Sequence, residues 1–505
     1  MRRLIAIVII SMVAAGALFA GGGQEAAGSE QKVVEFGLSG NPDTLDPQAT
    51  TGTLTFQVDR SIYDTLVEPD DHGKIVAALA ESWNVSADGK TWTFHLRHGV
   101  VFHNGDQFTS ADVKATFKRL TSPEQAAPTA REFSSISSID TPDPYTVVFH
   151  LPEPYAPLLA SMASGWGAIL PRRLIEAGHD FANNPVGTGP FAFKQWIRDN
   201  KIVLEKNPNY WMDGLPSVDG VTFNIITEST VQIQGLVTGR LDVADAVGQP
   251  DLEMLSTKPD VKVQRQLSSI VMVMAMNTAH KPLDNLKVRQ AINYAVDKQS
   301  VLDVAYGGGK VVGTFMDYSN PYYVDFTDLY PYDPDKARTL LAQAGVTDAT
   351  QLEMVLPQNY APHVRAGEIY QEMLTKVGLN VKIRLVDWST WLSDVYRGGN
   401  YDLTVIGHTG KLDPDGRLAG YGMPNENYVH WKNERAVQLI EKGRHVIGFE
   451  KRQPIYAEVL KIMAHEVPQL YLGTWYNYIG LRANVEGFRM DSQLDTFDLR
   501  QVQLK

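Results

Sequence analysis

Apolar and polar residues alternate along several short stretches of the chain. In TWTFHLR (residues 91–97), Trp92, Phe94 and Leu96 alternate with polar residues, and this period of two predicts a half-buried strand. VVEFGLSG (33–40) is typical of a strand that ends at a Gly-Asn-Pro turn. Residues 140–275 hold further strand-like stretches separated by turns: TVVFHL, FAFKQW, KIVLEK and GVTFNII. These stretches predict a β-rich region.

Other segments have the spacing of helices. Thr109 and Asp112 lie three residues apart and fit a capping box, and the apolar residues after them recur at helical spacing. Residues 286–306 predict one long amphipathic helix that ends at three consecutive glycines. A helix after Asp333 carries its own N-cap and a proline at its first position, and a last helix is expected over about 433–464.

Strands alternate with helices after residue 351, which predicts a parallel or mixed sheet in an α/β fold. Ligands of such sheets bind outside the carboxyl ends of the strands. The loops at these ends are rich in polar and aromatic residues: Gln358-Asn359-Tyr360, Asp387-Trp388 and His408-Thr409-Gly410. If the strands are neighbours, the loops converge on one edge and form a binding cleft.

Length, charge and composition narrow the class of protein. A chain of 505 residues is too long for one compact core, so at least two domains are expected. The net charge of −12 argues against a general affinity for nucleic acid or anionic membrane. Residues 1–20 have the layout of a secretory signal peptide, and residues 21–30 resemble a flexible tether. We therefore expect an exported, soluble protein in the periplasm or another extracytoplasmic space.

The chemistry in the sequence is sparse. The absence of cysteine excludes disulfides, thiolate nucleophiles and a cysteine-linked lipid anchor. GGGK at 307–310 lacks the first glycine and the final Ser/Thr of a phosphate loop, and Pro190 interrupts a dinucleotide-like glycine motif. His95 and His103 share parity along an extended chain, but His98 does not, which favours structural roles over a metal site. No cofactor, metal or catalytic residue is therefore predicted.

Several stretches resemble the extracytoplasmic solute-binding proteins of peptide-type ABC transporters (family 5, the dipeptide/oligopeptide/nickel-binding group). They occur in the family's order over nearly the whole mature chain: LDPQ at 45–48, the segment from IYDTLVEP to FHLRHGVVFHNGD, NPVGTGPFAF, EKNPNYW at 205–211, GRLDV at 239–243, MNTAHKPLDNLKVRQAINYAVDK at 276–298 and YDPDKARTLLAQAG. Together these motifs are far more specific than any one of them.

The resemblance implies a type II-like periplasmic-binding-protein fold, with two α/β lobes, mixed sheets and a ligand cleft between them. A two-strand hinge would cross near residues 270–278 and 468–478. Lobe I would then hold residues 31–273 together with 475–505, and lobe II would hold 274–474. A monomer is expected.

The same resemblance bears on the ligand. In the family's dipeptide binders, an aspartate in the loop after the YDL-type strand anchors the amino group of the ligand. Here that loop is GHTGKLDPDG, with Gly410 near the expected place and Asp413 as the first acid. Either Asp413 substitutes, or the ligand has no ammonium group to pair, or Asp413 and Asp415 only shape a turn.

Aromatic side chains complete the set of candidates. Trp388, Trp391, Tyr421, Trp475 and Tyr476 would stack on a peptide side chain or a sugar ring, or else pack in the core. The remaining cleft candidates come from strand ends and are Asn41, Asn359, Tyr360 and His408.

These observations predict a receptor that captures a peptide-like small solute by lobe closure and delivers it to an ABC permease in the membrane. An oligosaccharide receptor of the same fold is the alternative solute class. An exported hydrolase is the alternative from a different class of protein.

Overall fold

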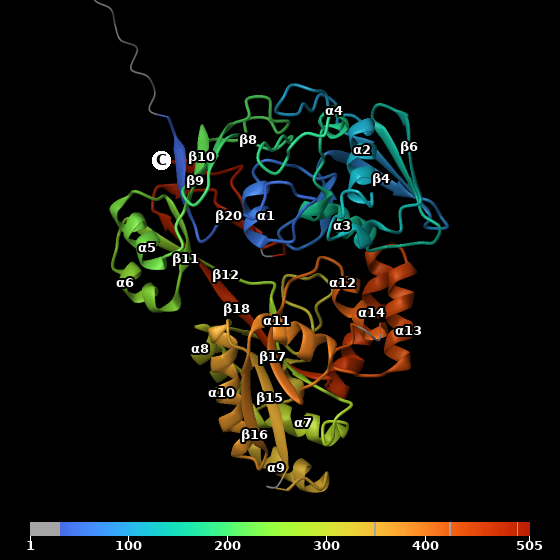
Figure 1. The fold of residues 1–505 in the computed structure, drawn as a ribbon, viewed down its shortest axis with the longest axis vertical. Helices are drawn as coiled ribbons and strands as arrows, with labels where there is room; N and C mark the ends of the chain where they lie inside the picture. The colour runs from blue at the N-terminus through green and yellow to red at the C-terminus, as the bar shows by residue number, and fades with distance from the viewer. Residues whose placement is uncertain (1–30, 348–349, 424–425, 492) are drawn as a thin grey trace, which may run out of the picture.

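The computed structural model describes residues 31–347, 350–423, 426–491 and 493–505. The predicted signal peptide (1–20) and tether (21–30) lie outside the described residues. Figure 1 shows a broad upper body and a narrower lower body, which we call the upper and lower lobes. Among the described helices, none combines the length and the apolar character that crossing a membrane requires.

One twelve-stranded sheet runs through both lobes. Its longest strand, β18 (Gln469–Arg482), pairs with strands of both lobes and passes from one to the other in Figure 1. The upper lobe contributes β1 (Val33–Leu38), β8 (Phe191–Ile197), β9 (Lys201–Lys206), β10 (Gly220–Ile225), β11 (Val243–Val247) and β12 (Val261–Leu267). The lower lobe contributes β13 (Val271–Met276), β14 (Gly309–Val311), β15 (Gln351–Pro357), β16 (Asn380–Val386) and β17 (Leu403–His408).

The two lobes are joined where β12 ends and β13 begins, beside the middle of β18. β12 pairs with residues 476–482 of β18, and β13 pairs with residues 469–473. Between them, the Ser268 N–H donates to the Trp475 carbonyl over 2.9 Å. Two adjacent strands therefore form the hinge, as in the predicted fold. Parallel pairs such as β15 with β16 and antiparallel pairs such as β13 with β17 make the sheet mixed.

A second sheet, antiparallel and four-stranded, also belongs to the upper lobe. It consists of β4 (Ala80–Val85), β5 (Thr91–Leu96), β7 (Thr146–His150) and β6 (Ser138–Asp143). The predicted alternation in β5 is confirmed, because Trp92, Phe94 and Leu96 are all buried. The predicted capping box is also confirmed: the Thr109 N–H donates to Asp112 Oδ2 over 2.8 Å at the start of α2 (Ser110–Leu120).

Shorter elements complete the upper lobe. Three small hairpin-like pairs are β2 (Val67–Pro69) with β3 (Ile75–Ala77), β19 (Val485–Glu486) with β22 (Gln503–Leu504), and β20 (Arg489–Asp491) with β21 (Thr496–Asp498). The helices are α1 (Thr53–Asp59), α3 (Leu158–Ala163), α4 (Arg172–Glu176), α5 (Ser229–Thr238) and α6 (Leu252–Ser256), with short 3₁₀ turns η1 (Ala130–Phe133) and η2 (Gly165–Gly167).

In the lower lobe, helices cover both faces of the sheet. One apolar core lies under α7 (Leu286–Ala295), α8 (Lys298–Tyr306), α9 (Pro334–Gln343) and α10 (Ala361–Thr375). The opposite core lies under α13 (Glu434–His445), α14 (Phe449–Glu466) and the π-helical segment η5 (Trp391–Arg397) that follows α11 (Trp388–Thr390). The predicted β–α–β order is confirmed, with β15 and β16 parallel and joined by α10.

Two helix predictions are wrong in the same way. The single helix expected over 286–306 is two helices, because Val296 is extended and the Asp297 carboxylate accepts the Ser300 N–H over 3.1 Å as a new N-cap. The helix expected over about 433–464 is also two helices. There Gly448 has a φ of 99°, a backbone conformation that interrupts a helix and that glycine adopts without strain.

The clustered histidines have separate surroundings. His103 lies between two backbone groups: its Nδ1 accepts the Gly187 N–H over 3.3 Å, and its Nε2 is 3.0 Å from the Gly189 carbonyl. Burial lowers the pKa of His103 to about 4, so the ring is neutral at physiological pH. His98 instead stacks on Tyr145. His103 therefore holds the 187–189 loop against the upper lobe.

Candidate ligand-binding site

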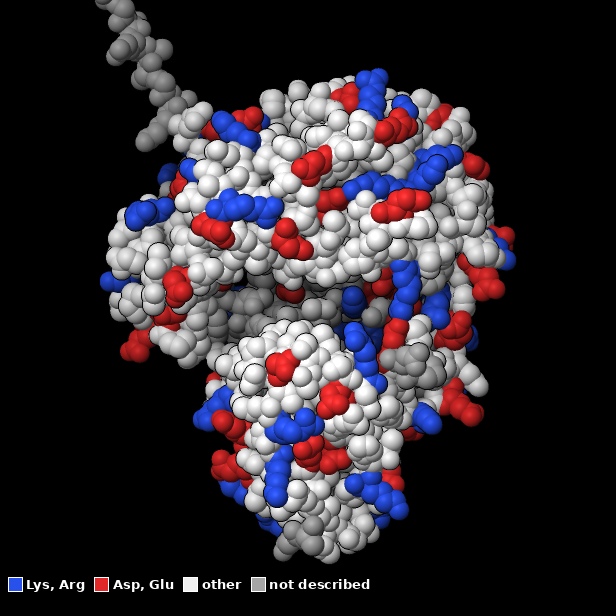
Figure 2. All heavy atoms as spheres, in the orientation of Figure 1, with Lys and Arg blue, Asp and Glu red and all other residues white. Residues whose placement is uncertain are grey.

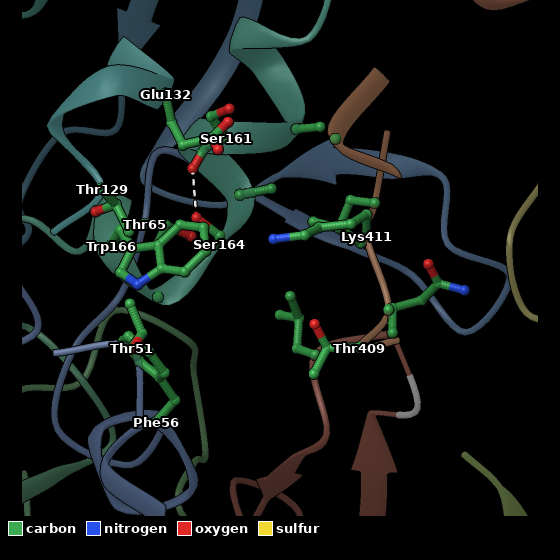
Figure 3. Close-up of a pocket in the computed structure, with 18 of the residues that line it drawn as sticks. Thr51, Phe56, Thr65, Thr129, Glu132, Ser161, Ser164, Trp166, Thr409 and Lys411 are labelled. Atoms are coloured by element: carbon green, nitrogen blue, oxygen red, sulfur yellow. Dashed lines mark hydrogen bonds between the residues drawn. The ribbon is translucent and has the colours of Figure 1, made fainter. Parts of the chain in front are cut away.

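A cavity of about 640 Å³ lies between the two lobes. Its upper wall comes from α1 and the turn after it, η1, α3, η2 and the loop at 493–496. Its lower wall is the loop that follows β17, residues 409–413, together with Gly416. Figure 2 shows the recess between the lobes, and Figure 3 shows the side chains that line the cavity.

Aromatic side chains form much of the upper wall. Phe56 from α1 and Trp166 from η2 meet edge to face, with ring centroids 6.0 Å apart, and Tyr155 lies on the same wall. Gly165 makes this contact possible, because a Cβ at that position would lie 2.3 Å from the Phe56 ring. In Figure 3 the Trp166 ring faces the open part of the cavity. Such rings offer apolar contact area to a bound solute.

Several charged residues of the cavity wall are already paired. The pairs are Arg60 with Glu68, Arg131 with Glu426, and Asp413 with Arg452. The pair of Arg131 and Glu426 joins the upper lobe to the lower one. By contrast, Lys411 and Glu132 have no ion-pair partner among the described residues. A cation of one lobe and an anion of the other thus remain available to a solute.

Two further acids lie in the wall, Asp59 buried and Asp495 half-buried. Burial, with the charges of Asp46 and Asp43, raises the pKa of Asp59 well above its ordinary value. Burial also raises the pKa of Asp495 to about 7, although the Ser269 hydroxyl donates to its carboxylate. Asp495 is therefore partly protonated near neutral pH and presents a polar rather than a fully charged surface.

Many buried polar atoms of the wall have no hydrogen-bond partner among the described residues. They are both carboxyl oxygens of Asp59, Thr129 Oγ1, Trp166 Nε1, Gln493 Nε2, Asp495 Oδ1 and Thr496 Oγ1. An unpaired buried polar atom costs free energy, so native structures satisfy nearly all of them with protein or water. Their concentration around one cavity indicates a site whose partners come from a solute or from water.

Asp413 is the one predicted site residue that lines this cavity, within the part of the chain that the structure describes. Its Oδ1 accepts from Arg452 over 2.8 Å, and the same oxygen accepts the Asp415 N–H. Arg452 is itself buried and also donates to the Gly443 carbonyl. The Asp413 carboxylate is thus already neutralised by the lower lobe, which supports its turn-forming role over direct pairing with a ligand ammonium.

His408 and Tyr421 line a smaller adjoining hollow of about 150 Å³. His408 Nε2 lies 2.9 Å from the Tyr428 hydroxyl, and Tyr421 accepts from Gln469 over 3.0 Å. Burial, with the neighbouring charge of Arg417, lowers the pKa of His408 to about 3. These side chains are neutral and mutually hydrogen-bonded beside the main cavity.

Three aromatic candidates contact one another instead. Trp388 stacks on Trp391 with ring centroids 5.0 Å apart and planes inclined by 5°, and Tyr360 meets Trp388 edge to face. Trp391 is 2% exposed and donates to Thr404 Oγ1. The loops after β15 and β16 therefore do converge, but as an aromatic cluster. Neither it nor the exposed neighbour Asn359 is among the described residues that line the two cavities.

The remaining candidates lie at the hinge and in the upper lobe. Trp475 stacks on Tyr306, and Tyr476 lies under the Arg265 guanidinium at 4.4 Å from its ring centre. Asn41 accepts the Asp199 N–H over 3.2 Å. None of the three is among the described lining residues of either cavity.

The sequence did not predict most of the residues that form the upper wall of the cavity. Phe56, Glu132 and Trp166 come from separate short helices, and no periodic spacing connects them. Lys411 lies in the loop that the sequence did single out, next to Gly410. Its positive charge, next to the glycine at the expected position of the anchoring aspartate, is the signal in the sequence that points to Lys411.

The fold and the cavity define a class of protein. Two α/β lobes, joined by two adjacent strands and enclosing a polar and aromatic cavity, are the architecture of a two-lobed binding protein. The model of the bacterial extracellular solute-binding proteins, family 5 (middle), matches residues 74–428. The chain belongs to this family of binding proteins, and the predicted family and two-lobed fold are confirmed.

Individual relatives agree with this assignment. Di/tripeptide-binding protein 1 of Pseudomonas aeruginosa is 31% identical, over 90% of this chain and 91% of the relative. Among solved structures, AgaA from A. tumefaciens R10 in complex with agropinic acid is 30% identical with a TM-score of 0.74, over 94% of this chain and 99% of that one. The dipeptide-binding protein from Pseudoalteromonas sp. SM9913 in complex with Met-Leu is 25% identical with a TM-score of 0.75, over 94% and 100%.

Proposed function

We propose that this protein is the extracytoplasmic receptor of an ABC importer and that it captures a peptide-like small solute between its lobes. The observation that carries the proposal is the cavity itself. It lies between the lobes of a family 5 binding protein and has aromatic walls. It also presents charges of both signs that have no ion-pair partner in the part of the chain that the structure describes. The names of the relatives support peptides, since they include di/tripeptide-binding proteins and a Met-Leu complex.

Binding in such a cavity requires no bond chemistry. The solute would gain contacts with both walls only when the lobes approach, so it stabilises the closed form over the open form. Lobe I, residues 31–273 with 475–505, would rotate against lobe II, residues 274–474, about the β12–β13 and β18 crossings. The closed monomer, exported by the segment 1–20, would then deliver the solute to membrane permease subunits.

Isothermal titration calorimetry of the mature chain against dipeptides and tripeptides tests this proposal. We expect at least one peptide to bind with micromolar or tighter affinity, about −8 kcal/mol or better. Oligosaccharides titrated in parallel address the alternative solute class. The proposal fails if no peptide binds, or if a bound peptide is recovered cleaved by mass spectrometry, the result expected of a hydrolase.

A matched pair of variants locates the site. Trp166→Ala removes an aromatic wall of the cavity and should weaken peptide binding at least tenfold. Trp388→Ala removes an aromatic residue of the neighbouring cluster, outside the described lining of the cavity, and should leave the affinity within about threefold. Equal effects of the two variants would place the peptide elsewhere.

A further inference from the structure

Lys411 is held in position at the end of the lower-lobe loop. The Asn320 side chain donates to the Lys411 carbonyl over 2.8 Å, which fixes the backbone, and Leu412 packs into the apolar core of the upper lobe. Figure 3 shows the Lys411 ammonium projecting into the cavity toward Trp166. Its Nζ lies 5.5 Å from the centre of the Trp166 ring, near the outer limit of a cation–π contact.

The ammonium charge is not neutralised by the wall around it. No carboxylate of the described residues lies within 4.0 Å of Lys411 Nζ. Asp413, two residues away, is paired with Arg452, and Asp59 and Asp495 have raised pKa values. Burial lowers the pKa of Lys411 itself, while the charge of Glu132 acts in the opposite direction.

We infer that Lys411 binds a carboxylate of the solute and that this receptor therefore selects solutes with a free carboxylate group. The inference rests on the proposed function and specifies its substrate class. For a peptide, the C-terminal carboxylate would lie against Lys411 in the lower lobe. The rest of the peptide would extend along Phe56 and Trp166, with its ammonium group toward Glu132 in the upper lobe.

This arrangement follows from the chemistry of the site. A carboxylate that accepts from a partly desolvated ammonium makes a charge-assisted hydrogen bond, stronger than one between neutral groups. It would also relieve the cost of keeping the Lys411 charge in a half-buried position. Since Lys411 belongs to the lower lobe and Glu132 to the upper lobe, a solute that engages both would favour closure.

Calorimetry with modified peptides tests the inference. The probes are Met-Leu, Ala-Gln and Ala-Ala-Ala, each as the free acid, the C-terminal amide and the N-acetyl form, together with agropinic acid. They are titrated into wild type, Lys411→Met and Lys382→Met. Lys382 is exposed on β16 and serves as the matched control for loss of one lysine from the same lobe.

We expect amidation to weaken binding at least tenfold and N-acetylation to weaken it less. Lys411→Met should weaken the binding of the free acids at least tenfold and leave the binding of the amides unchanged. Lys382→Met should bind every probe as wild type does.

Two results would overturn the inference but leave the receptor proposal standing. In the first, wild type binds free acids and amides equally; in the second, Lys411→Met binds the free acids as tightly as wild type does. Binding of agropinic acid alone, with loss in Lys411→Met, overturns the peptide proposal and supports the carboxylate inference. No binding by any probe overturns both.

Discussion

The carboxylate of Asp413 shows how a residue in the wall of the cavity contributes to the stability of the fold. It is buried with Arg452, and both partners have further hydrogen bonds within the lower lobe. Removing one member of a buried pair leaves the other charge without compensation, which costs about 3–5 kcal/mol. We expect Arg452→Met to lower the free energy of unfolding by about that amount in urea titrations.

The exposed pair of Arg338 and Asp335 provides the comparison. Arg338→Met should change the free energy of unfolding by less than about 1 kcal/mol, because surface ion pairs contribute little. If the two variants lose similar amounts of unfolding free energy, the Asp413–Arg452 pair contributes no more to stability than an exposed ion pair.

Asp495 gives a pH dependence with a defined sign. Its pKa is raised from 3.8 to about 7 by burial, with the charges of Asp317 and Asp491 acting in the same direction. Between these values the folded protein keeps a proton that the unfolded chain has lost, so this residue makes stability fall as the pH rises toward about 7. Above that pH its contribution no longer changes.

Asp495→Asn is neutral at every pH and should lack this contribution. Urea unfolding at about pH 4 and about pH 8 should therefore show the variant gaining stability relative to wild type as the pH rises. Ser269→Ala removes a hydrogen bond that lowers the pKa of Asp495, and should extend the pH dependence to higher pH. A difference between Asp495→Asn and wild type that is constant with pH would contradict this account.

At the residue scale, the loop singled out in the sequence does line the cavity, with both Lys411 and Asp413 in its wall. Asp413 attracted attention as the first acid after Gly410, yet its charge is satisfied by Arg452, which lies 39 positions away. Of the charged side chains in this loop, Lys411 has no ion-pair partner among the described residues. Whether a charge is paired depends on tertiary contacts, and local sequence does not reveal them.

At the scale of elements, the long helix predicted over 286–306 shows where periodicity fails. The apolar spacing continues through Val296, but Asp297 begins a second helix by accepting the Ser300 N–H. We expect Asp297→Ala to lower the free energy of unfolding by about 1 kcal/mol through loss of this cap. Differential scanning calorimetry and urea titration would both register the change.

Asp303 on the same helix is the matched control, since it lies outside the cap and accepts from the Gln299 side chain. Asp303→Ala should change stability by less than about 0.5 kcal/mol. If Asp297→Ala is equally mild, the two helices are separated by packing rather than by the cap.

Elements with strong local signals were otherwise predicted well. The alternation of β5, the capping box of α2 and the N-cap of α9 at Asp333 all appear in the structure. At the carboxyl ends of β15 and β16, where a cleft was expected, the Trp388 ring contacts both Tyr360 and Trp391. Propensity identifies the strands, but the partner of each aromatic ring depends on the whole lobe.

At the scale of the whole molecule, both lobes share one continuous sheet through β18. The family resemblance implied a two-strand hinge. The upper wall of the cavity, by contrast, combines residues from 51 to 168 with residues 493–496. Chain segments this far apart meet only in the folded structure. The site was therefore less predictable than the fold.

The central claim is that a peptide bound between the lobes draws them together. The chain has no cysteine, so Lys114→Cys on α2 and Lys442→Cys on α13 accept spin labels at two exposed positions, one in each lobe. The distance distribution between the labels, measured by double electron–electron resonance with and without the tightest-binding peptide, tests the claim directly. The account predicts a shorter and narrower distribution with peptide. An unchanged distribution at saturating peptide would contradict it.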